Sequence, residues 1–137
     1  MASNIAVLHY ATKSPEKVRT LALAFAHGLQ MQNLSVDLMD GDTEIISGMA
    51  RYPVIALIAD TNFWGRMPGK LDTFFLRAGM LNGIKCYVYM AKQPVGGKYA
   101  LNDLIKLVEE HGMKVRNFGL LQSEKAAQNA GLSCRIE

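Results

Sequence analysis

The sequence predicts a three-layer α/β/α domain, in which helices cover both faces of a doubly wound, five-stranded parallel sheet. Two observations predict this fold class. Short apolar runs recur along the chain at intervals of about thirty residues or fewer, and segments with helical periodicity separate them. The runs are apolar along nearly their whole length, which indicates burial on both faces and therefore parallel strands between two layers of helices.

The five apolar runs are the expected strands, and the segments between them are long enough for right-handed crossover connections. The strands are expected at Ile5 to Tyr10, Val36 to Met39, Val54 to Ala59, Cys86 to Met90, and Val115 to Leu121.

The first helix follows the first strand and has the clearest start signal in the chain. Ser14 is a suitable N-cap, and Pro15 suits the first helical position. The apolar residues that follow recur at spacings of three and four, which places them on one face of a helix. They are Val18, Leu21, Ala22, Phe25 and Leu29.

Periodicity predicts four further helices along the chain. They are a short helix from Asp42 to Met49, one striped by Leu71, Phe74, Phe75 and Ala78, one striped by Leu101, Leu104, Ile105 and Val108 that ends at Gly112, and one from Ser123 to Ala130. For the last of these, we expect Ser123 to be the N-cap and Gly131 to end the helix.

Length and composition favour a single domain spanning residues 1–137. No run approaches the roughly 20 apolar residues of a membrane span, and the first residues lack a basic segment, so we expect a cytoplasmic protein. Cys86 and Cys134 have neither metal-ligand spacing nor a disulfide framework, and we interpret both as free structural thiols. The net charge of +3 comes from dispersed Lys and Arg, a pattern that does not indicate nucleic-acid binding.

Residues 61–75 follow the third expected strand and are rich in aromatic residues and glycine. In open α/β sheets, ligands bind beyond the carboxyl ends of the strands. Phe63 and Trp64 would stand at that edge and offer flat apolar faces, which favours a planar ligand. The alternative is that the two rings only cover the end of the sheet.

Three motifs suggest a known family. The residues after the third expected strand fit the pattern Thr-x-Phe-Gly-x-Met-x-Gly-x-Met-x-x-Phe, with Trp64 as one extra residue. The matching positions are Thr61, Phe63, Gly65, Met67, Gly69, Leu71 and Phe74. A Gly96-Gly97 turn follows the fourth strand, and His111-Gly112-Met113 precedes the fifth. In these motifs and in the order of its elements, the chain resembles the flavodoxin-like superfamily, most closely the tryptophan-repressor-binding-protein type of NAD(P)H:quinone oxidoreductases.

This resemblance implies the strand order 2-1-3-4-5, with FMN across the ends of strands one, three and four. It also implies two walls for the flavin ring. One consists of Thr61, Asn62, Phe63, Trp64 and Gly65, and the other of Ala91, Lys92, Gln93, Pro94, Val95, Gly96 and Gly97. Since the flavin itself carries the hydride chemistry, the protein need encode neither a catalytic acid or base nor a metal site.

The stretch that would hold the flavin phosphate departs from the family pattern, Ser/Thr-x-Thr-Gly-x-Thr, because it contains no glycine. Pro15 lacks an N–H donor, and Glu16 places a negative charge in the first turn. Thr12 and Ser14 still offer hydroxyls, and Lys13 offers a positive charge. Two interpretations remain: a helix cap alone, or a cap that also binds phosphate by these other means.

The leading functional hypothesis is an FMN-binding redox protein that accepts hydride from NAD(P)H and reduces a quinone or similar acceptor. The alternative is a flavodoxin-like domain that has lost FMN and serves as a binding or assembly module, with Phe63, Trp64 and Met67 as its partner surface. A third interpretation is a site for another phosphorylated small molecule. We expect no nucleic-acid or membrane partner, and a homodimer remains open.

Overall fold

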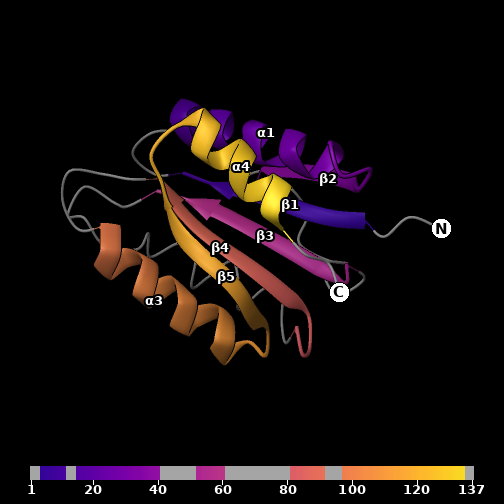
Figure 1. The fold of residues 1–137 in the computed structure, drawn as a ribbon. Helices are drawn as coiled ribbons and strands as arrows, with labels where there is room; N and C mark the ends of the chain where they lie inside the picture. The colour runs from indigo at the N-terminus through magenta and orange to yellow at the C-terminus, as the bar shows by residue number, and fades with distance from the viewer. Residues whose placement is uncertain (1–3, 12–14, 41–51, 61–80, 92–96, 135–137) are drawn as a thin grey trace.

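Five parallel strands form a single sheet in the order β2-β1-β3-β4-β5 (Figure 1). The structure is a computed structural model that describes residues 4–11, 15–40, 52–60, 81–91 and 97–134. Its strands are β1 (Asn4–Tyr10), β2 (Ser35–Asp40), β3 (Val54–Ala59), β4 (Lys85–Ala91) and β5 (Lys114–Leu121). The predicted fold class and strand order are confirmed, and each predicted strand lies within an observed one.

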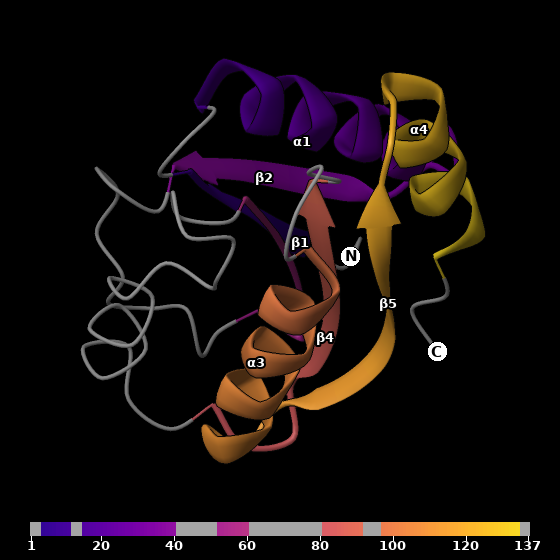
Figure 2. The ribbon, with the colours of Figure 1, turned by 90° about the vertical axis from the view of Figure 1, so that its left-hand side faces the viewer.

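Helices cover both faces of the sheet, as the apolar strands require. The helices in the described residues are α1 (Pro15–Gln30), α3 (Gly97–Glu110) and α4 (Glu124–Ser133). In Figures 1 and 2, α1 and α4 lie together over one face of the sheet, and α3 covers the other. The helices predicted at residues 42–49 and 71–78 lie outside the described residues.

The sheet separates two apolar clusters, because alternate side chains of each strand point to opposite faces. Ala6 and Leu8 of β1 pack on the α3 side with Leu104, whereas Ile5 and Val7 pack on the side of α1 and α4. β3 is buried over its whole length, so the layers of helices leave none of its side chains in water. This explains why the sequence of β3 shows a continuous apolar run rather than alternation.

The helix ends mostly follow the predicted signals. Pro15 is the first residue of α1, and the Ser123 Oγ accepts a hydrogen bond from the Ala126 N–H at 3.2 Å as the N-cap of α4. Gly112 follows the end of α3 with a φ of 90°, and its N–H donates to the Glu109 carbonyl oxygen at 3.0 Å. A side chain is disfavoured at that φ, so glycine ends the helix here as expected.

Gly131 does not end α4, which contradicts the prediction from the sequence. The helix continues to Ser133, and Gly131 lies inside it against Gly28 of α1. A Cβ on Gly131 would collide with the Phe25 carbonyl oxygen, and a Cβ on Gly28 would collide with the Gln128 carbonyl oxygen. The two glycines are therefore explained by a backbone-to-backbone helix crossing, a tertiary contact that helix-end signals do not reveal.

A glutamine side chain strengthens the same crossing. The Gln32 amide nitrogen donates to the Gly131 carbonyl oxygen at 2.5 Å and to the Cys134 carbonyl oxygen at 3.2 Å. The second bond reaches the residue that caps α4, so Gln32 satisfies carbonyl groups near the carboxyl end of that helix. The turn after α1 and the end of α4 are thereby held together.

We predict that Gly28→Ala destabilises the protein by about 1–3 kcal/mol, because the added methyl group forces α1 and α4 apart. Gly131→Ala should have a similar effect, since its Cβ meets the opposite backbone. Urea unfolding measures both changes. Gly119→Ala is the control, because its nearest contact would be the Tyr89 ring at 3.8 Å, and its stability should stay within about 0.5 kcal/mol of wild type. If Gly28→Ala and Gly131→Ala were as stable as the wild type, the crossing would tolerate a methyl group and the prediction would be wrong.

Candidate functional site

The candidate site is the edge of the sheet at which all five strands end. Parallel pairing brings the carboxyl ends of neighbouring strands together, and the register places Tyr10 of β1 beside Ala59 of β3, which in turn pairs with Met90 of β4. The amino ends of α1, α3 and α4 return to this same edge, because each helix follows a strand directly in the chain. Strand ends and helix starts therefore converge on one side of the molecule (Figure 2).

The order in which the chain adds strands to the sheet reverses between β1 and β3. From β1 the chain continues to β2 on one side, whereas β3 pairs with β1 on its other side. At such a reversal the connections leave the sheet in opposite directions and open a crevice beyond the strand ends, where ligands bind in doubly wound folds. The sequence places the predicted flavin site at this position.

The structure describes two of the predicted cofactor-binding residues, Ala91 and Gly97. Ala91 is the buried last residue of β4, and Gly97 is the first residue of α3. The other predicted residues lie outside the described residues; they are Thr12, Lys13, Ser14, Thr61, Asn62, Phe63, Trp64, Gly65, Lys92, Gln93 and Gly96. Their roles remain predictions.

The attachment points of the predicted segments do lie together. Segment 12–14 follows β1 and Ala11, segment 61–65 follows β3 and Asp60, and segment 92–96 follows β4 and Ala91. Because β1, β3 and β4 are consecutive in the sheet, the three segments start from neighbouring strands at one edge. Residues that are far apart in the sequence are thus brought to one place by the strand order.

Alanine residues lie at or directly after the ends of these three strands. Ala11 directly follows β1, Ala59 ends β3 and Ala91 ends β4, and both Ala59 and Ala91 are fully buried. Ala59 packs in the apolar cluster on the α3 side of the sheet, and Ala91 packs in the cluster on the side of α1 and α4.

Asp60 is a candidate site residue that sequence reasoning missed. It directly follows the buried strand β3 and has no exposed surface. Among the described residues, it is the charged residue that the fold buries completely. A buried carboxylate is stable only when other groups of the protein compensate for its lost hydration, and Asp60 does take part in an interaction within the protein. An acidic residue directly after a fully apolar run was the available signal in the sequence.

The first turns of the three helices at this edge differ in charge. The first turns of α1 and α4 carry Glu16 and Glu124, whereas the first turn of α3 carries no acidic residue and contains Lys98. The positive end of a helix dipole favours a nearby anion. The two glutamates stabilise their own helices but reduce the attraction of these helix starts for a ligand phosphate.

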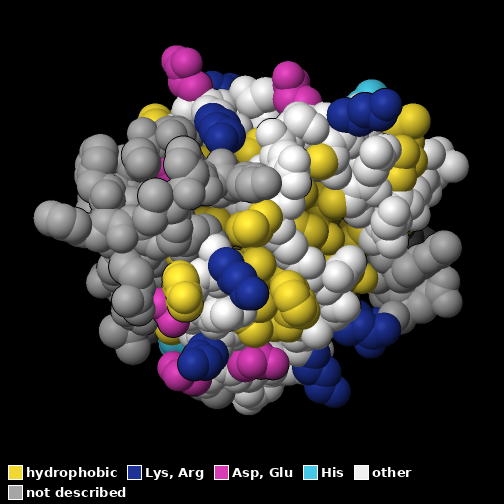
Figure 3. All heavy atoms as spheres, turned by 60° about the vertical axis from the view of Figure 1, so that its left-hand side comes forward, with side chains coloured by type: hydrophobic (Ala, Val, Ile, Leu, Met, Phe, Trp, Pro, Cys, Tyr) yellow, Lys and Arg dark blue, Asp and Glu magenta, His cyan; other side chains and the backbone are white. Residues whose placement is uncertain are grey.

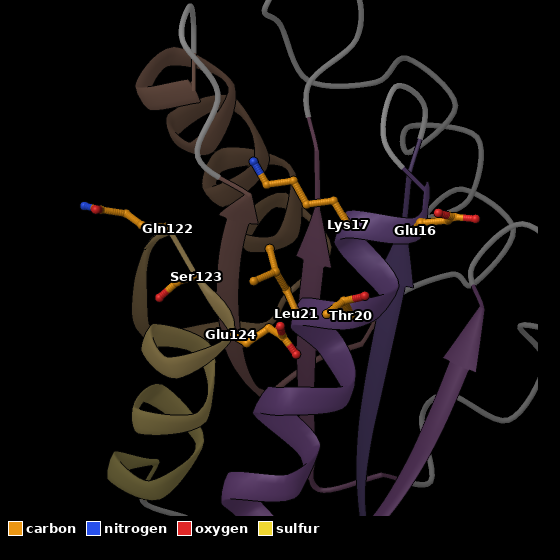
Figure 4. Close-up of a pocket in the computed structure, with 7 residues that line it drawn as sticks. All are labelled: Glu16, Lys17, Thr20, Leu21, Gln122, Ser123 and Glu124. Carbon is orange, nitrogen blue, oxygen red and sulfur yellow. The ribbon is translucent and has the colours of Figure 1, made fainter.

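A hollow of about 370 Å³ lies between the first turns of α1 and α4 (Figure 4). Its floor includes the buried side chain of Leu21, and its rim is polar. The residues that line it are Glu16, Lys17, Thr20, Leu21, Gln122, Ser123 and Glu124. Figure 4 shows Lys17 extending from α1 in the direction in which the strand arrows point, whereas Glu16 extends to the other side of the helix.

Hydrophobic side chains reach the surface on the side of the molecule drawn in Figure 3. They form a band across the middle of this view, with Lys and Arg side chains within it and acidic side chains towards its upper and lower rims. Among the described residues, two aromatic side chains are strongly exposed: Tyr99 in the first turn of α3, at 70 %, and Phe118 of the outer strand β5, at 55 %. Tyr99 is therefore a second residue near the candidate site that sequence reasoning missed.

Both cysteines are buried free thiols, which agrees with their interpretation as structural residues. Burial raises the pKa of the Cys86 thiol to about 12. Burial also raises the pKa of Cys134 to about 11, although a hydrogen bond with Tyr87 acts in the opposite direction. The thiolate is the reactive form, so neither side chain is a nucleophile in the folded protein at neutral pH.

The described residues contain no group of three or more side chains arranged to hold a metal ion. None of their helices is long and apolar enough to cross a membrane.

Comparison with known proteins identifies the fold. No family model matches the chain, and no curated protein matches its sequence. Among solved structures, the chain is similar to a flavodoxin from the domain Archaea, with a TM-score of 0.71 and 17 % identity over 94 % of each chain. It is similar to the Streptococcus pneumoniae TIGR4 flavodoxin, with a TM-score of 0.75 and 15 % identity over 93 % of this chain and 94 % of that one.

A third similar structure is the two-electron reduced flavodoxin of Megasphaera elsdenii, with a TM-score of 0.76 and 12 % identity over 95 % of this chain and 99 % of that one. These similarities extend over almost the whole chain, and the fold is flavodoxin-like. At identities this low they establish the fold alone, and function has to be argued from the site.

We predict that the free energy of unfolding falls as pH rises above 9. Both folded thiol pKa values are raised above the ordinary value of 9.0, so only the unfolded chain loses these protons between pH 9 and 11. The slope should reach about 1.4 kcal/mol per pH unit for each thiol. Urea unfolding between pH 7 and 10.5 measures it, and Cys134→Ala should reduce the slope. Burial also raises the pKa of Tyr89, which adds to the slope above pH 10. A flat profile up to pH 10.5 would contradict the prediction.

Proposed function

We propose that the protein binds FMN at the carboxyl edge of β1, β3 and β4 and works as a redox protein. The observation that carries this proposal is the reversal of strand order between β1 and β3, next to which the three predicted flavin-binding segments begin. Similarity of fold to three flavodoxins supports it.

In the finer form of the proposal, NAD(P)H is the electron donor and a quinone or similar molecule is the acceptor, as in the oxidoreductases that the sequence motifs resemble. A bound FMN would supply the ring that accepts hydride and passes electrons on. The contribution of the chain would be to bind and orient the ring between segments 61–65 and 91–97 and to keep water away from its buried side. Asp60 lies at the start of the first of these segments, where its burial would help to fix the direction in which the chain leaves β3.

Flavin binding is tested directly with the purified protein. We expect added FMN to show a shifted absorption spectrum and quenched fluorescence, with saturation at micromolar concentrations or below. NAD(P)H with a soluble quinone then tests turnover of the loaded protein. Absence of FMN binding at micromolar concentrations would refute the proposal, whereas binding without turnover would refute only the finer form.

We predict that Trp64→Ala weakens FMN binding by about 1–3 kcal/mol, which is the scale of an aromatic side chain stacked on a flat ring. Trp64 lies outside the described residues, and its place beside the ring follows from the motif at residues 61–65. Titration of flavin fluorescence gives the affinity, and Trp64→Phe is the control that retains an aromatic face. An unchanged affinity of Trp64→Ala would remove this residue from the site.

A flavin-free binding or assembly module is the second candidate. Two observations favour it: the start of α1 with Pro15 and Glu16 is poorly suited to a phosphate, and Tyr99 and Phe118 are exposed aromatic side chains of the kind that anchor protein interfaces. Light scattering discriminates between the two functions. A protein that binds no flavin, forms an oligomer, and loses it in Phe118→Asp or Trp64→Asp would support the module.

A third candidate is a site for another phosphorylated small molecule, and a thermal-shift screen would detect such a ligand through its stabilisation of the folded state.

A further inference from the structure

The outer edge of β5 is a strand edge that carries apolar side chains at the surface. β5 follows β4 as the last strand of the sheet, and no strand of the described residues pairs with its outer side (Figures 1 and 2). The Phe118 side chain is 55 % exposed, and Leu120 is partly exposed. An uncovered edge of this kind is a template on which a strand of another molecule can pair, through its N–H and C=O groups.

The Phe118 ring lies on the same face of the sheet as α3. Leu120, two residues further along β5, packs against the apolar cluster on that face, and side chains two residues apart in a strand point to the same side. The exposed ring therefore stands at the rim of the sheet, where it would pack against the side chains of any strand added to β5.

The backbone N–H of Phe118 has an acceptor of its own at this rim. Phe118 is in register with Val88 of β4, yet its N–H donates to the Oδ1 of the neighbouring Asn117 at 2.9 Å, in a bond exposed to solvent. Successive N–H groups of a strand point alternately to its two sides, and an exposed N–H of β5 points away from β4. The Asn117 side chain thus occupies a donor that a pairing strand would need.

We propose that Asn117 blocks the outer edge of β5 against strand pairing with a second copy of the chain. For a pair to form there, a carbonyl oxygen of the incoming strand would have to displace the Asn117 side chain from the Phe118 N–H, and the existing hydrogen bond would be lost. In a symmetric pair of β5 strands, both copies would lose this bond. The block therefore acts twice against self-association, whether or not the protein binds a flavin.

Two further features of β5 act in the same direction. The register between β4 and β5 shifts at Arg116, which lies between the paired residues Val115 and Asn117. An additional residue of this kind bends the strand and increases its local twist, which hinders the pairing of a further strand. Lys114 and Arg116 are both exposed, so two β5 strands side by side would also bring like charges together.

Substitution of Asn117 tests the block through a gain of self-association. Asn117→Val removes the acceptor and provides a side chain that suits a strand, and Asn117→Ala removes the acceptor without a branched side chain. Sedimentation of the purified proteins at rising concentration measures their association. We expect Asn117→Val to associate at a concentration about tenfold lower than the wild type, and Asn117→Ala to change in the same direction.

Two control variants separate the loss of the acceptor from other effects. Asn117→Asp retains an acceptor oxygen at the same position and should associate no more than the wild type. Asn102→Val removes an exposed amide from α3 and should also behave as the wild type. Urea unfolding of each variant verifies that the fold is intact, so that strand pairing is distinguished from aggregation of unfolded chains.

Amide hydrogen exchange locates the contact. In Asn117→Val, exchange of the Phe118 amide should slow as the protein concentration rises, because its N–H then donates to a carbonyl oxygen of a second β5 strand. In the wild type, the rate should not depend on concentration.

The proposal is overturned if Asn117→Val and Asn117→Ala associate no more than the wild type, or if Asn102→Val gains as much as they do. Slower exchange of the wild-type Phe118 amide at high concentration would overturn it too, since the edge would then already be paired. All of these measurements use protein without added flavin, so their outcome leaves the proposed flavin-binding function to its own test.

Discussion

The parallel pairing of β1 with strands on both of its sides determines the rest of the architecture. β1 is held between β2 and β3 in register, from Ile5 beside Val54 to Tyr10 beside Ala59. Parallel strands require crossover connections, so each described helix starts at the carboxyl edge of the sheet and runs back towards the amino edge. Layers of helices, buried apolar strands and a single edge where the loops gather all follow from this one constraint. The candidate site lies beside the end of β1 because β2 is added on one side of β1 and β3 on the other.

The contact between α1 and α4 fixes the electrostatics of that edge. Gly28 and Gly131 let the two backbones cross closely, and Gln32 joins the end of one helix to the other. Because the helices are close along their length, their first turns also lie near one another and form the two sides of a polar hollow. Each first turn carries a glutamate that stabilises its own helix dipole, so the positive field expected at a pair of helix starts is partly cancelled.

Most of the fold could be predicted from the sequence, because buried parallel strands leave a continuous apolar signal and helix caps depend on local chemistry. The fully buried β3 and the caps at Pro15, Gly112 and Ser123 were of this kind. Gly131 was assigned wrongly, since a glycine required by a neighbouring backbone has the same local sequence signal as one that ends a helix. Asp60 and Tyr99 were missed because burial and exposure are properties of the folded chain. Most of the predicted flavin residues lie outside the described residues, so only the strands from which they start could be compared with the prediction.

The sequence by itself determined the class of fold, the positions of the strands and of the three described helices, and the resemblance of residues 61–75 to a flavin-binding segment, because periodicity, caps and motifs are local patterns. Only the tertiary structure decided which strand ends are neighbours, which glycines serve a helix crossing, and which charges share a hollow. These are relations between residues that lie up to about a hundred positions apart, such as Gln32 and Gly131. Such contacts depend on the order of strands in the sheet and on the packing of one layer against another, and no local pattern in the chain encodes them.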